Sequence, residues 1–366
     1  MKRLSNSFIL IILCVVIVAC YAAKNITTER EPEIKNVILM IGDGMGLSEV
    51  CAAMTVSDKP LNIERCSVTG LQKTFSSDYY VTDSGAAGTA IATGHKTKNG
   101  AIGVGPDGNR LKSILEYAEE NGLATGMVAT SSITHATPAS FIAHQKNRSS
   151  YEDIAMDFLL TDIDVFIGGG YDHFAKRADR LNLIDSLRLR GYEVDTSMNM
   201  ILKSKSGKLA GFTAPDQNPF RLNGRGDMLP ESTAKAIELL NKNKNGFFLM
   251  VEGSQIDWAG HGNYADTLID ETLDFDKAVG VALDFAEKDK NTLVIITADH
   301  ETGGVTITGG NMASHKVNLN FSTMGHTPVM IPVYAYGPGA GILSGIYDNT
   351  DIFKKIMISY GFNQKK

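Results

Sequence analysis

Six short runs of apolar residues stand out along the chain, at positions 37–41, 127–129, 164–167, 247–251, 293–296 and 331–336. Most of these runs lack polar alternation, which is typical of strands that are buried on both faces of a parallel sheet. Helical periodicity lies between them, at positions 111–121, 232–241 and 267–286. Strands that alternate with helices predict an α/β fold with a doubly wound, mostly parallel central sheet and helices on both faces.

Polar residues flank most of these runs, usually directly after the run ends. In an open α/β sheet, ligands bind beyond the carboxyl ends of the strands, so these side chains are expected to converge on one crevice. The carboxylates and histidines among them are Asp43, Glu252, Asp257, His261, Asp299, His300 and His326. A lone aspartate at a strand end is usually a helix cap, but seven residues at matching positions favour bound cations, because buried carboxylates otherwise repel one another. Two histidines with a carboxylate suit catalytic zinc, and all-oxygen sets suit magnesium.

Ser84 lies in a second group of chemically interesting residues, the stretch VTDSGAAGTA at positions 81–90. Small residues follow the serine and continue into a helix-like segment. Asp83 or Ser84 can cap that helix, and the same position lets the helix amides and dipole favour an anion beside Ser84. The two interpretations are compatible. The stretch has no Gly-x-Ser-x-Gly motif, so a hydrolase triad is not supported.

Seven motifs in this chain resemble those of alkaline phosphatases, and they occur in the family order from about residue 35 to residue 340. They are NVILMIGDGMG at 36–46, positions 81–104 with TDS and TGHKTKNG, HATPA at 135–139 with Arg148, GGG at 168–170, VEG at 251–253 with Asp257 and His261, TADHETGG at 297–304, and GHT at 325–327. Seven ordered motifs are hard to obtain by chance.

The resemblance implies three metal sites and two catalytic residues. A first Zn²⁺ would be held by Asp257, His261 and His326. A second Zn²⁺ would be held by Asp43, Asp299 and His300, with Ser84 as its fourth ligand. A third ion, usually Mg²⁺, would be held by Asp43, Thr137 and Glu252. Thr137 alone also fits the start of a helix before Pro138.

The same resemblance implies hydrolysis of small phosphomonoesters. Ser84 would attack phosphorus to form a phosphoserine, which water then hydrolyses. Arg148, which the bare sequence would place in solvent, would bind the phosphate through its planar fork. The alternatives are a phosphodiesterase on the same scaffold and a lipid-anchored metal- or phosphate-binding protein without turnover. A sulfatase is not supported, because SGAAG at 84–88 lacks the C/S-x-P-x-R motif.

His135 and Trp258 stand where some family members have Asp and Lys, and this pair resembles a bacterial branch. We expect both residues beside the third site rather than among its ligands. The pair leaves the third ion open, to Mg²⁺ or to Co²⁺, because imidazole favours softer metals. Trp258 can also simply pack against the end of the sheet.

The N-terminus predicts export. Lys2 and Arg3 precede an apolar run at 8–19, which is too short to span a bilayer but suits a signal peptide. The run ends at Cys20, so we expect residues 1–19 to be a lipoprotein-type signal, Cys20 to carry a lipid anchor, 20–34 to be a tether and 35–366 to be a single catalytic domain. Cleavage near residue 22 or 23 is the alternative. The expected location is the periplasm or cell envelope.

Composition and the remaining sequence features bear on the class of protein and on its partners. The chain is 43% hydrophobic and 21% charged, as in ordinary globular proteins, and its net charge of −6 gives no reason to expect a nucleic-acid partner. Cys51 and Cys66 can pair or stay free after export. Positions 311–324 leave little room for the insertion that aids dimer contact in larger relatives, so a homodimer stays open.

Overall fold

The computed structural model describes residues 33–362. A single compact unit begins at Ile34. The signal peptide, Cys20 and nearly all of the tether that the sequence predicts lie outside the described residues. Within the described residues, no helix combines the length and the apolar character needed to cross a membrane.

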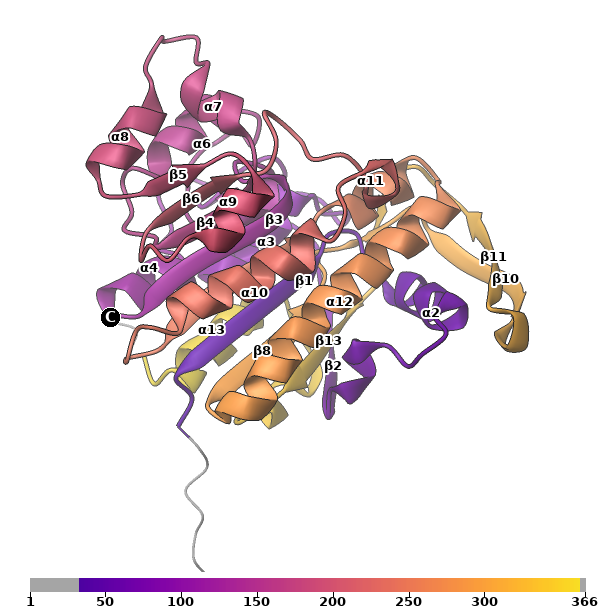
Figure 1. Ribbon diagram of the computed structural model, residues 1–366. Coiled ribbons are helices and arrows are strands. Elements are labelled where there is room, and N and C mark those ends of the chain that lie inside the picture. The colour runs from indigo at the N-terminus through magenta and orange to yellow at the C-terminus, as the bar shows by residue number, and fades with distance from the viewer. Residues whose placement is uncertain (1–32, 363–366) are drawn as a thin grey trace, which may run out of the picture. The chain divides into compact units, whose positions relative to one another are not determined.

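A ten-stranded sheet forms the centre of the unit, in the order β14-β2-β13-β8-β1-β7-β3-β4-β6-β5 (Figure 1). Its strands are β1 (Asn36–Gly42), β2 (Val68–Lys73), β3 (Ala124–Ser132), β4 (Val165–Gly169), β5 (Glu193–Asp195), β6 (Leu209–Phe212), β7 (Phe247–Gly253), β8 (Thr292–Thr297), β13 (Ile331–Tyr336) and β14 (Gly345–Asp348). All six predicted runs are strands of this sheet. β1 is buried throughout and pairs in parallel with β7 on one side and β8 on the other.

The sixth run does not follow the parallel pattern that its apolar character suggested. β13 lies antiparallel to both β8 and β2. The reason is the connection between β8 and β13, in which the described chain forms no α-helix. It forms the strand pair β9 (Glu301–Thr302) and β12 (His326–Thr327), and the hairpin of β10 (Val305–Asn311) and β11 (Lys316–Phe321) with a single 3-10 turn at Met312–Ser314. A parallel neighbour needs a crossover back to the start of the sheet, whereas this chain turns back at the carboxyl end.

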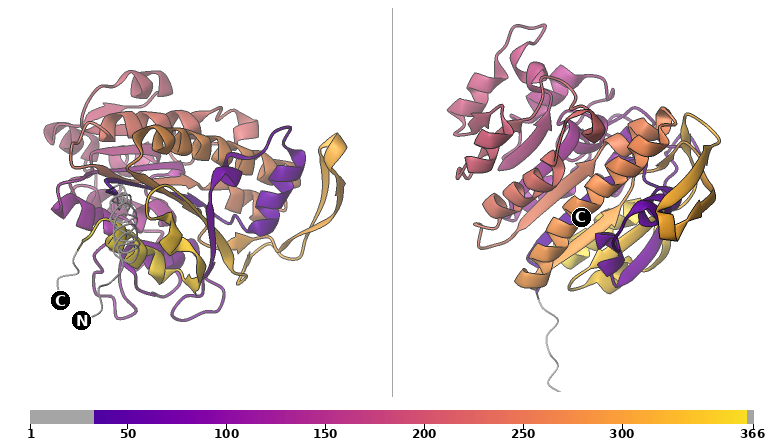
Figure 2. Two further views of the ribbon diagram at one scale, coloured as in Figure 1. Left: turned by 90° about the horizontal axis from the view of Figure 1, so that it is seen from below. Right: turned by 45° about the vertical axis from the view of Figure 1, so that its right-hand side comes forward.

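Helices cover both faces of the sheet, as predicted, and β1 shows how the faces divide. Ile38 and Met40 contribute to one core, together with α2 (Leu47–Val56), α9 (Met198–Lys203), α10 (Met228–Leu240), α11 (Gln255–His261) and α12 (Ala265–Asp289). Val37, Leu39 and Ile41 contribute to the other, together with α3 (Ser84–Thr93), α4 (Ile114–Glu120), α5 (Ala136–Ala139), α6 (Tyr151–Asp157), α7 (Tyr171–Ala175), α8 (Leu183–Leu189) and α13 (Thr350–Ser359). Figure 2 shows the long helices α10 and α12 lying along one face.

The β10–β11 hairpin occupies the region where the sequence left little room for an insertion. It extends away from the body of the unit in both figures. Its two strands pair with each other and with no strand of the central sheet. The polypeptide therefore leaves the sheet after β8, makes this excursion, and returns to place His326 beside the end of β8.

Candidate active site

The predicted ligands come together at the carboxyl edge of the central strands. Asp43 follows β1, Glu252 lies near the end of β7, and Asp299 and His300 follow β8. The short helix α11 after β7 carries Asp257 and His261, and β12 carries His326. Three groups of side chains there are close enough to hold a metal ion, each with its candidate ligand atoms within 4.8 Å of one another.

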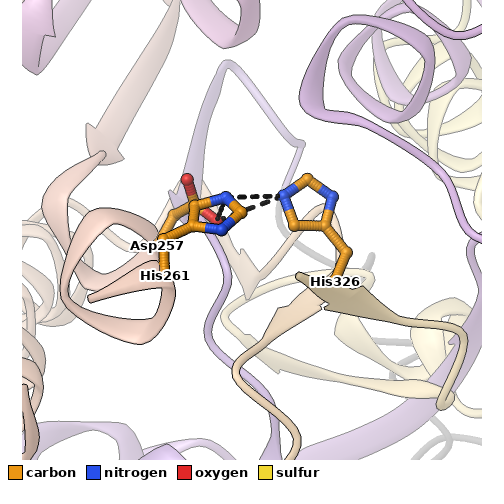
Figure 3. A group of neighbouring side chains, drawn as sticks. All are labelled: Asp257, His261 and His326. Atoms are coloured by element: carbon orange, nitrogen blue, oxygen red, sulfur yellow. Dashed lines mark hydrogen bonds and ion pairs between the residues drawn. The ribbon is translucent and has the colours of Figure 1, made fainter. Parts of the chain in front are cut away.

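The first group is Asp257, His261 and His326 (Figure 3). Nε2 of His261 lies 3.3 Å from Oδ1 of Asp257, Nε2 of His326 lies 3.4 Å from the same oxygen, and the two Nε2 atoms are 3.1 Å apart. Each histidine donates its Nδ1–H to a backbone carbonyl, that of Met324 at 2.5 Å or that of Thr82 at 2.8 Å. When the rings are neutral, this tautomer leaves both Nε2 lone pairs facing the carboxylate, an arrangement that suits a cation.

The second group is Asp43, Asp299 and His300, all fully buried. Nε2 of His300 lies 3.2 Å from Asp299 and 3.5 Å from Asp43. Asp43 Oδ1 and Asp299 Oδ2 have no hydrogen-bond partner. Buried carboxylate oxygens without donors are costly to an empty protein, so the donor set itself fits a divalent ion.

The third group is Asp43, His135 and Glu252. Glu252 Oε1 and His135 Nδ1 are buried and have no partner. Thr137 Oγ1 donates to Asp43 Oδ2 at 3.2 Å, so this threonine also reaches the group. A ring nitrogen of His135 lies within 4.8 Å of a carboxylate oxygen of both Asp43 and Glu252, which is closer to the group than the position beside the site that we expected and makes His135 a further candidate ligand.

Burial dominates the electrostatics of the second and third groups. Burial, together with the neighbouring carboxylates, raises the pKa of Asp43 well above its ordinary value, that of Asp299 to about 6 and that of Glu252 to about 7, although hydrogen bonds from serine hydroxyls partly oppose the rise at Glu252. Burial also lowers the pKa of His135 to about 3. The second and third groups disfavour ionised carboxylates, because the side chains that form these groups supply little positive charge.

Asp257 behaves differently. Burial acts to raise its pKa, but the hydrogen bond with His326 and the charges of the nearby histidines outweigh burial, so the pKa lies below the ordinary value. His326 shows the complement: burial acts to lower its pKa, and Asp257 more than compensates. The first group therefore has internal charge complementarity that the other two groups lack.

Ser84 is the first residue of α3 and is buried beside the second group, with its Oγ 3.2 Å from Nε2 of His300. Asp83 caps the helix by accepting the amide N–H of Ala86 at 2.9 Å. The other Asp83 oxygen accepts Nη1 of Arg148 at 2.8 Å. The structure therefore joins the start of α3 to Arg148 through one carboxylate. A helix N-terminus with a nearby guanidinium favours a bound anion.

Comparison with known proteins identifies the family. Residues 34–320 match the alkaline phosphatase family. The chain is 36% identical to alkaline phosphatase 3 of Bacillus subtilis, over 92% of this chain and 91% of that protein. The chain belongs to the alkaline phosphatase family. It is also 34% identical to the alkaline phosphatase of Escherichia coli, over 89% of this chain and 86% of that protein.

Solved structures agree with this membership in the alkaline phosphatase family. The alkaline phosphatase of the Antarctic bacterium TAB5 superposes with a TM-score of 0.86 at 45% identity, covering 91% of this chain and all of that one. A TAB5 variant with aspartate in place of a histidine, with Mg bound in its M3 site, gives a TM-score of 0.87 at 44% identity, over 92% of this chain and 100% of that chain. The predicted fold is thereby confirmed.

Family membership also gives the reaction: the chain is a metal-dependent phosphomonoesterase of the alkaline phosphatase family. This assignment selects phosphomonoester hydrolysis over the phosphodiesterase and over the binding protein without turnover. The three metal-capable groups agree with it, because each contains the donor types that zinc or magnesium prefers.

Two features of this alkaline phosphatase site were not visible in the sequence. Trp258 lies against His135 in an edge-to-face contact, with ring centroids 5.7 Å apart. Thr302 is fully buried, and its Oγ1 contacts both Asp257 and His300. Two signals could have found Thr302: it lies within the motif TADHETGG at 297–304, and it follows His300 by two residues, the spacing that puts side chains on the same side of an extended segment.

Proposed function

We propose that Ser84 is the covalent nucleophile of this phosphomonoesterase and that Arg148 binds the phosphoryl oxygens. The observation that carries the proposal is the position of Ser84 Oγ, 3.2 Å from Nε2 of His300 and at the first residue of α3. The first amides of a helix have no partner within the helix and favour an anion, and of those in α3 Ala86 already donates to Asp83.

The proposed reaction uses Ser84 twice. Its Oγ attacks phosphorus, the bond from phosphorus to the leaving alcohol breaks, and a phosphoserine forms. In the first step the proton of the Ser84 hydroxyl ends on the leaving alcohol. Water then attacks the phosphorus of the phosphoserine, the bond from Ser84 Oγ to phosphorus breaks, inorganic phosphate leaves, and a proton from the water restores the Ser84 hydroxyl. Arg148 and the amides at the start of α3 hold the equatorial oxygens during both displacements. Divalent ions bound by the first two groups would supply neutralisation of the entering and leaving oxygens.

We assign the ions by donor chemistry. The first group, with two imidazoles and a carboxylate, and the second group, Asp43, Asp299 and His300, are proposed to hold Zn²⁺. The third group, with Asp43, Glu252, Thr137 and His135, is proposed to hold Mg²⁺ or Co²⁺. A TAB5 variant with aspartate in place of a histidine has Mg in its M3 site, which supports an influence of this kind of residue on the third ion.

The test of the nucleophile is Ser84→Ala. The variant should retain its metal content but form no phosphoenzyme when it is quenched in acid during turnover of a labelled monoester. Ser84→Thr is the matched control, since it keeps a hydroxyl at the same position. Recovery of a labelled phosphoenzyme from Ser84→Ala contradicts the assignment.

The test of the third site uses the pair His135 and Trp258, which we propose as the mark of a distinct branch. Zinc-loaded enzyme with an empty third site is titrated with Mg²⁺ and with Co²⁺. We expect Co²⁺ to activate at least as well as Mg²⁺, because imidazole nitrogen favours the softer ion. His135→Asp with Trp258→Lys should shift the preference to Mg²⁺. An unchanged preference shows that these residues do not select the ion.

We further propose that the enzyme is exported and lipid-anchored at Cys20, with residues 20–34 as the tether of one catalytic domain. The start of the compact unit at Ile34 supports these bounds. A diacylglyceryl group plus an N-linked acyl chain would give stable anchoring, where one chain would not. Mass spectrometry of the mature N-terminus tests this, and an unmodified N-terminus beyond Cys20 contradicts it.

Sedimentation of detergent-solubilised enzyme tests the homodimer.

A further inference from the structure

Thr302 lies between the first and second metal-capable groups. It is fully buried on β9, and its register partner across the strand pair is His326 of the first group. Its Oγ1 lies 2.5 Å from Asp257 Oδ1, which belongs to the first group, and 3.2 Å from His300 Nδ1, which belongs to the second. One hydroxyl therefore contacts a proposed ligand of each site.

The hydroxyl has a single proton, which limits how it can serve both neighbours. An ionised Asp257 can only accept a hydrogen bond, so the Thr302 proton points to Asp257 Oδ1. The Thr302 oxygen then has only lone pairs to offer His300, and the contact is favourable only if His300 carries its proton on Nδ1. This tautomer leaves Nε2 of His300 unprotonated, and Nε2 is the atom that faces Asp43, Asp299 and Ser84.

The other two histidines do not depend on a side chain in this way. His261 and His326 donate their Nδ1–H to the backbone carbonyls of Met324 and Thr82, which can only accept. A hydroxyl can either donate or accept, so the tautomer of His300 depends on where the hydroxyl proton goes. Asp257 directs that proton, and in this way a ligand of the first group determines the state of a ligand in the second.

The backbone around Thr302 is arranged to leave room for this contact. Gly44 adopts a φ of +75°, and a Cβ there would lie 2.8 Å from Thr302 Oγ1 and 2.8 Å from Asp257 Cα. The carbonyl of Gly44 accepts the amide N–H of Thr302 at 3.1 Å, and the amide of Gly44 donates to Asp299 at 3.2 Å. The loop that carries Asp43 thus holds Thr302 through the backbone of Gly44, and position 44 requires glycine.

We propose that Thr302 is a positioning residue that holds His300 in its metal-binding tautomer and couples the first metal group to the second through Asp257. This inference rests on the proposed metal roles of Asp257 and His300. Outer-shell partners of metal-binding histidines typically contribute 10–100-fold to metal affinity. The prediction is that loss of the hydroxyl weakens zinc binding at both groups.

The experiment compares the wild type with Thr302→Val, which has nearly the same shape, and with Thr302→Ser, which restores the hydroxyl. Thr272→Val is the matched control, because Thr272 is also buried and donates only to the carbonyl of Leu268 within α12. Zinc per chain is followed during timed exposure to a chelator. Thr302→Val should shorten the half-life of both bound zinc ions by about 10–100-fold, while Thr302→Ser and Thr272→Val stay close to the wild type.

Ring ¹⁵N NMR of histidine-labelled, metal-free protein gives a readout that does not depend on activity. The chain has 8 histidines, so the ring signals are few, and a His300→Asn variant assigns the signal of interest. His300 should be protonated only on Nδ1 in the wild type and should populate both tautomers in Thr302→Val.

Three results overturn the inference: an Nε2-protonated His300 in the metal-free wild type, unchanged zinc half-lives in Thr302→Val, or equal losses in Thr302→Val and Thr302→Ser. If Thr302→Val does not fold, the wild-type spectrum and Thr302→Ala decide. A wild-type protein that binds no zinc at these groups contradicts the proposed function itself, which separates the two failures.

Discussion

Two clusters of buried acids in this protein look alike in composition and differ in their counterions. The metal-group acids, Asp43, Glu252 and Asp299, lie at the carboxyl edge of the sheet. The arginine-bound acids, Glu271 and Asp274, lie on α12 and contact the buried side chain of Arg225, with Nη2 2.5 Å from Glu271 and 2.9 Å from Asp274. Among the described residues, no lysine or arginine forms a salt bridge with any metal-group acid.

The difference teaches how to separate a structural charge cluster from a metal site. Burial raises the pKa of Glu271 and Asp274, but the hydrogen bonds and charge of Arg225 oppose it. No directly bound cation opposes the effect of burial on the pKa values of the metal-group acids. Arg148, the arginine proposed to bind phosphate in this site, forms its salt bridge with Asp83 instead. The protein therefore completes one cluster by itself and leaves the other to be completed by ions.

Removal of the metals should produce the largest effect, a complete loss of monoester hydrolysis. The metal-free protein should also become less stable as pH rises. Asp299 and Glu252 have folded-state pKa values of about 6 and about 7, above the ordinary values near 4. The contribution of these two acids to stability then falls between about pH 4 and pH 7, whereas burial lowers the pKa of His135 and of His300, which contribute in the opposite direction below about pH 6.5; the net fall is therefore expected at the upper end of the window. Urea unfolding of chelator-treated protein from pH 4 to pH 8 measures the effect.

The metal-loaded protein is the control for that profile. Metal binding requires deprotonated ligands, so the stabilisation by bound metal should increase with pH. Glu119, whose pKa burial also raises to about 7, contributes equally to both forms and cancels in their difference. If the two forms show the same pH profile, the metal-group acids do not titrate as their burial predicts.

Arg225→Met should reduce the free energy of unfolding by about 3–5 kcal/mol, because it leaves the buried Glu271 without its cation and Asp274 with only the longer 3.4 Å contact to Arg221. Zinc content should not change. The matched control is Arg188→Met, since Arg188 forms only an exposed pair with Asp185 and should contribute less than about 1 kcal/mol. Urea unfolding measures both variants. If Arg225→Met and Arg188→Met lower the free energy of unfolding equally, the arginine-bound acids do not depend on Arg225.

Arg148→Ala should lower kcat/KM for a phosphomonoester by an amount equivalent to about 1.5–3 kcal/mol, the value of one charge-assisted hydrogen bond. Hydrolysis of a phosphodiester should change less, because a diester offers the guanidinium fewer charged oxygens. Arg148→Lys keeps the charge but not the planar fork and should recover only part of the loss. Equal losses for both substrates argue against phosphate binding by Arg148.

Glu252→Gln should have the smallest effect and the opposite sign. In the metal-free protein at pH 8 it removes one buried, unpaired charge and should stabilise the fold by roughly 1–2 kcal/mol. Glu271→Gln, which breaks a pair with Arg225, should destabilise it. If the two substitutions change the free energy of unfolding in the same direction, the distinction between the two clusters is wrong.

The central strands of the sheet and the candidate ligands at its carboxyl edge could be predicted from the sequence, because both depend on local patterns. The buried runs that form β1, β7 and β8 are recognisable by themselves, and Asp43, Glu252 and Asp299 lie at fixed offsets from them. The direction of β13 was not readable, since a strand pattern is the same in either direction and the connection decides. Four strands of the sheet were missed: β2, β5 and β14, whose residues are only partly buried, and β6, which is buried but only four residues long.

Side-chain distances set the limit within the site. The sequence predicted that His135 lies near the third group, but only the structure shows a ring nitrogen within 4.8 Å of carboxylate oxygens of Asp43 and Glu252. Thr302 lies in the motif TADHETGG, but its role was missed for the same reason, because it depends on Oγ1 lying between Asp257 and His300.

The central place of β1 has a consequence for how the chain is made. β1 ends at Gly42, but its two neighbours begin only at Phe247 and Thr292. A ribosome that adds about 5–20 residues per second needs roughly 10–40 s between the first strand and its nearest partner. During that time the buried strand β1 has neither of its sheet neighbours, and Asp43 lacks Glu252, Asp299 and His300. The middle of the sheet is thus assembled late, and pairing between segments so far apart in the chain slows folding.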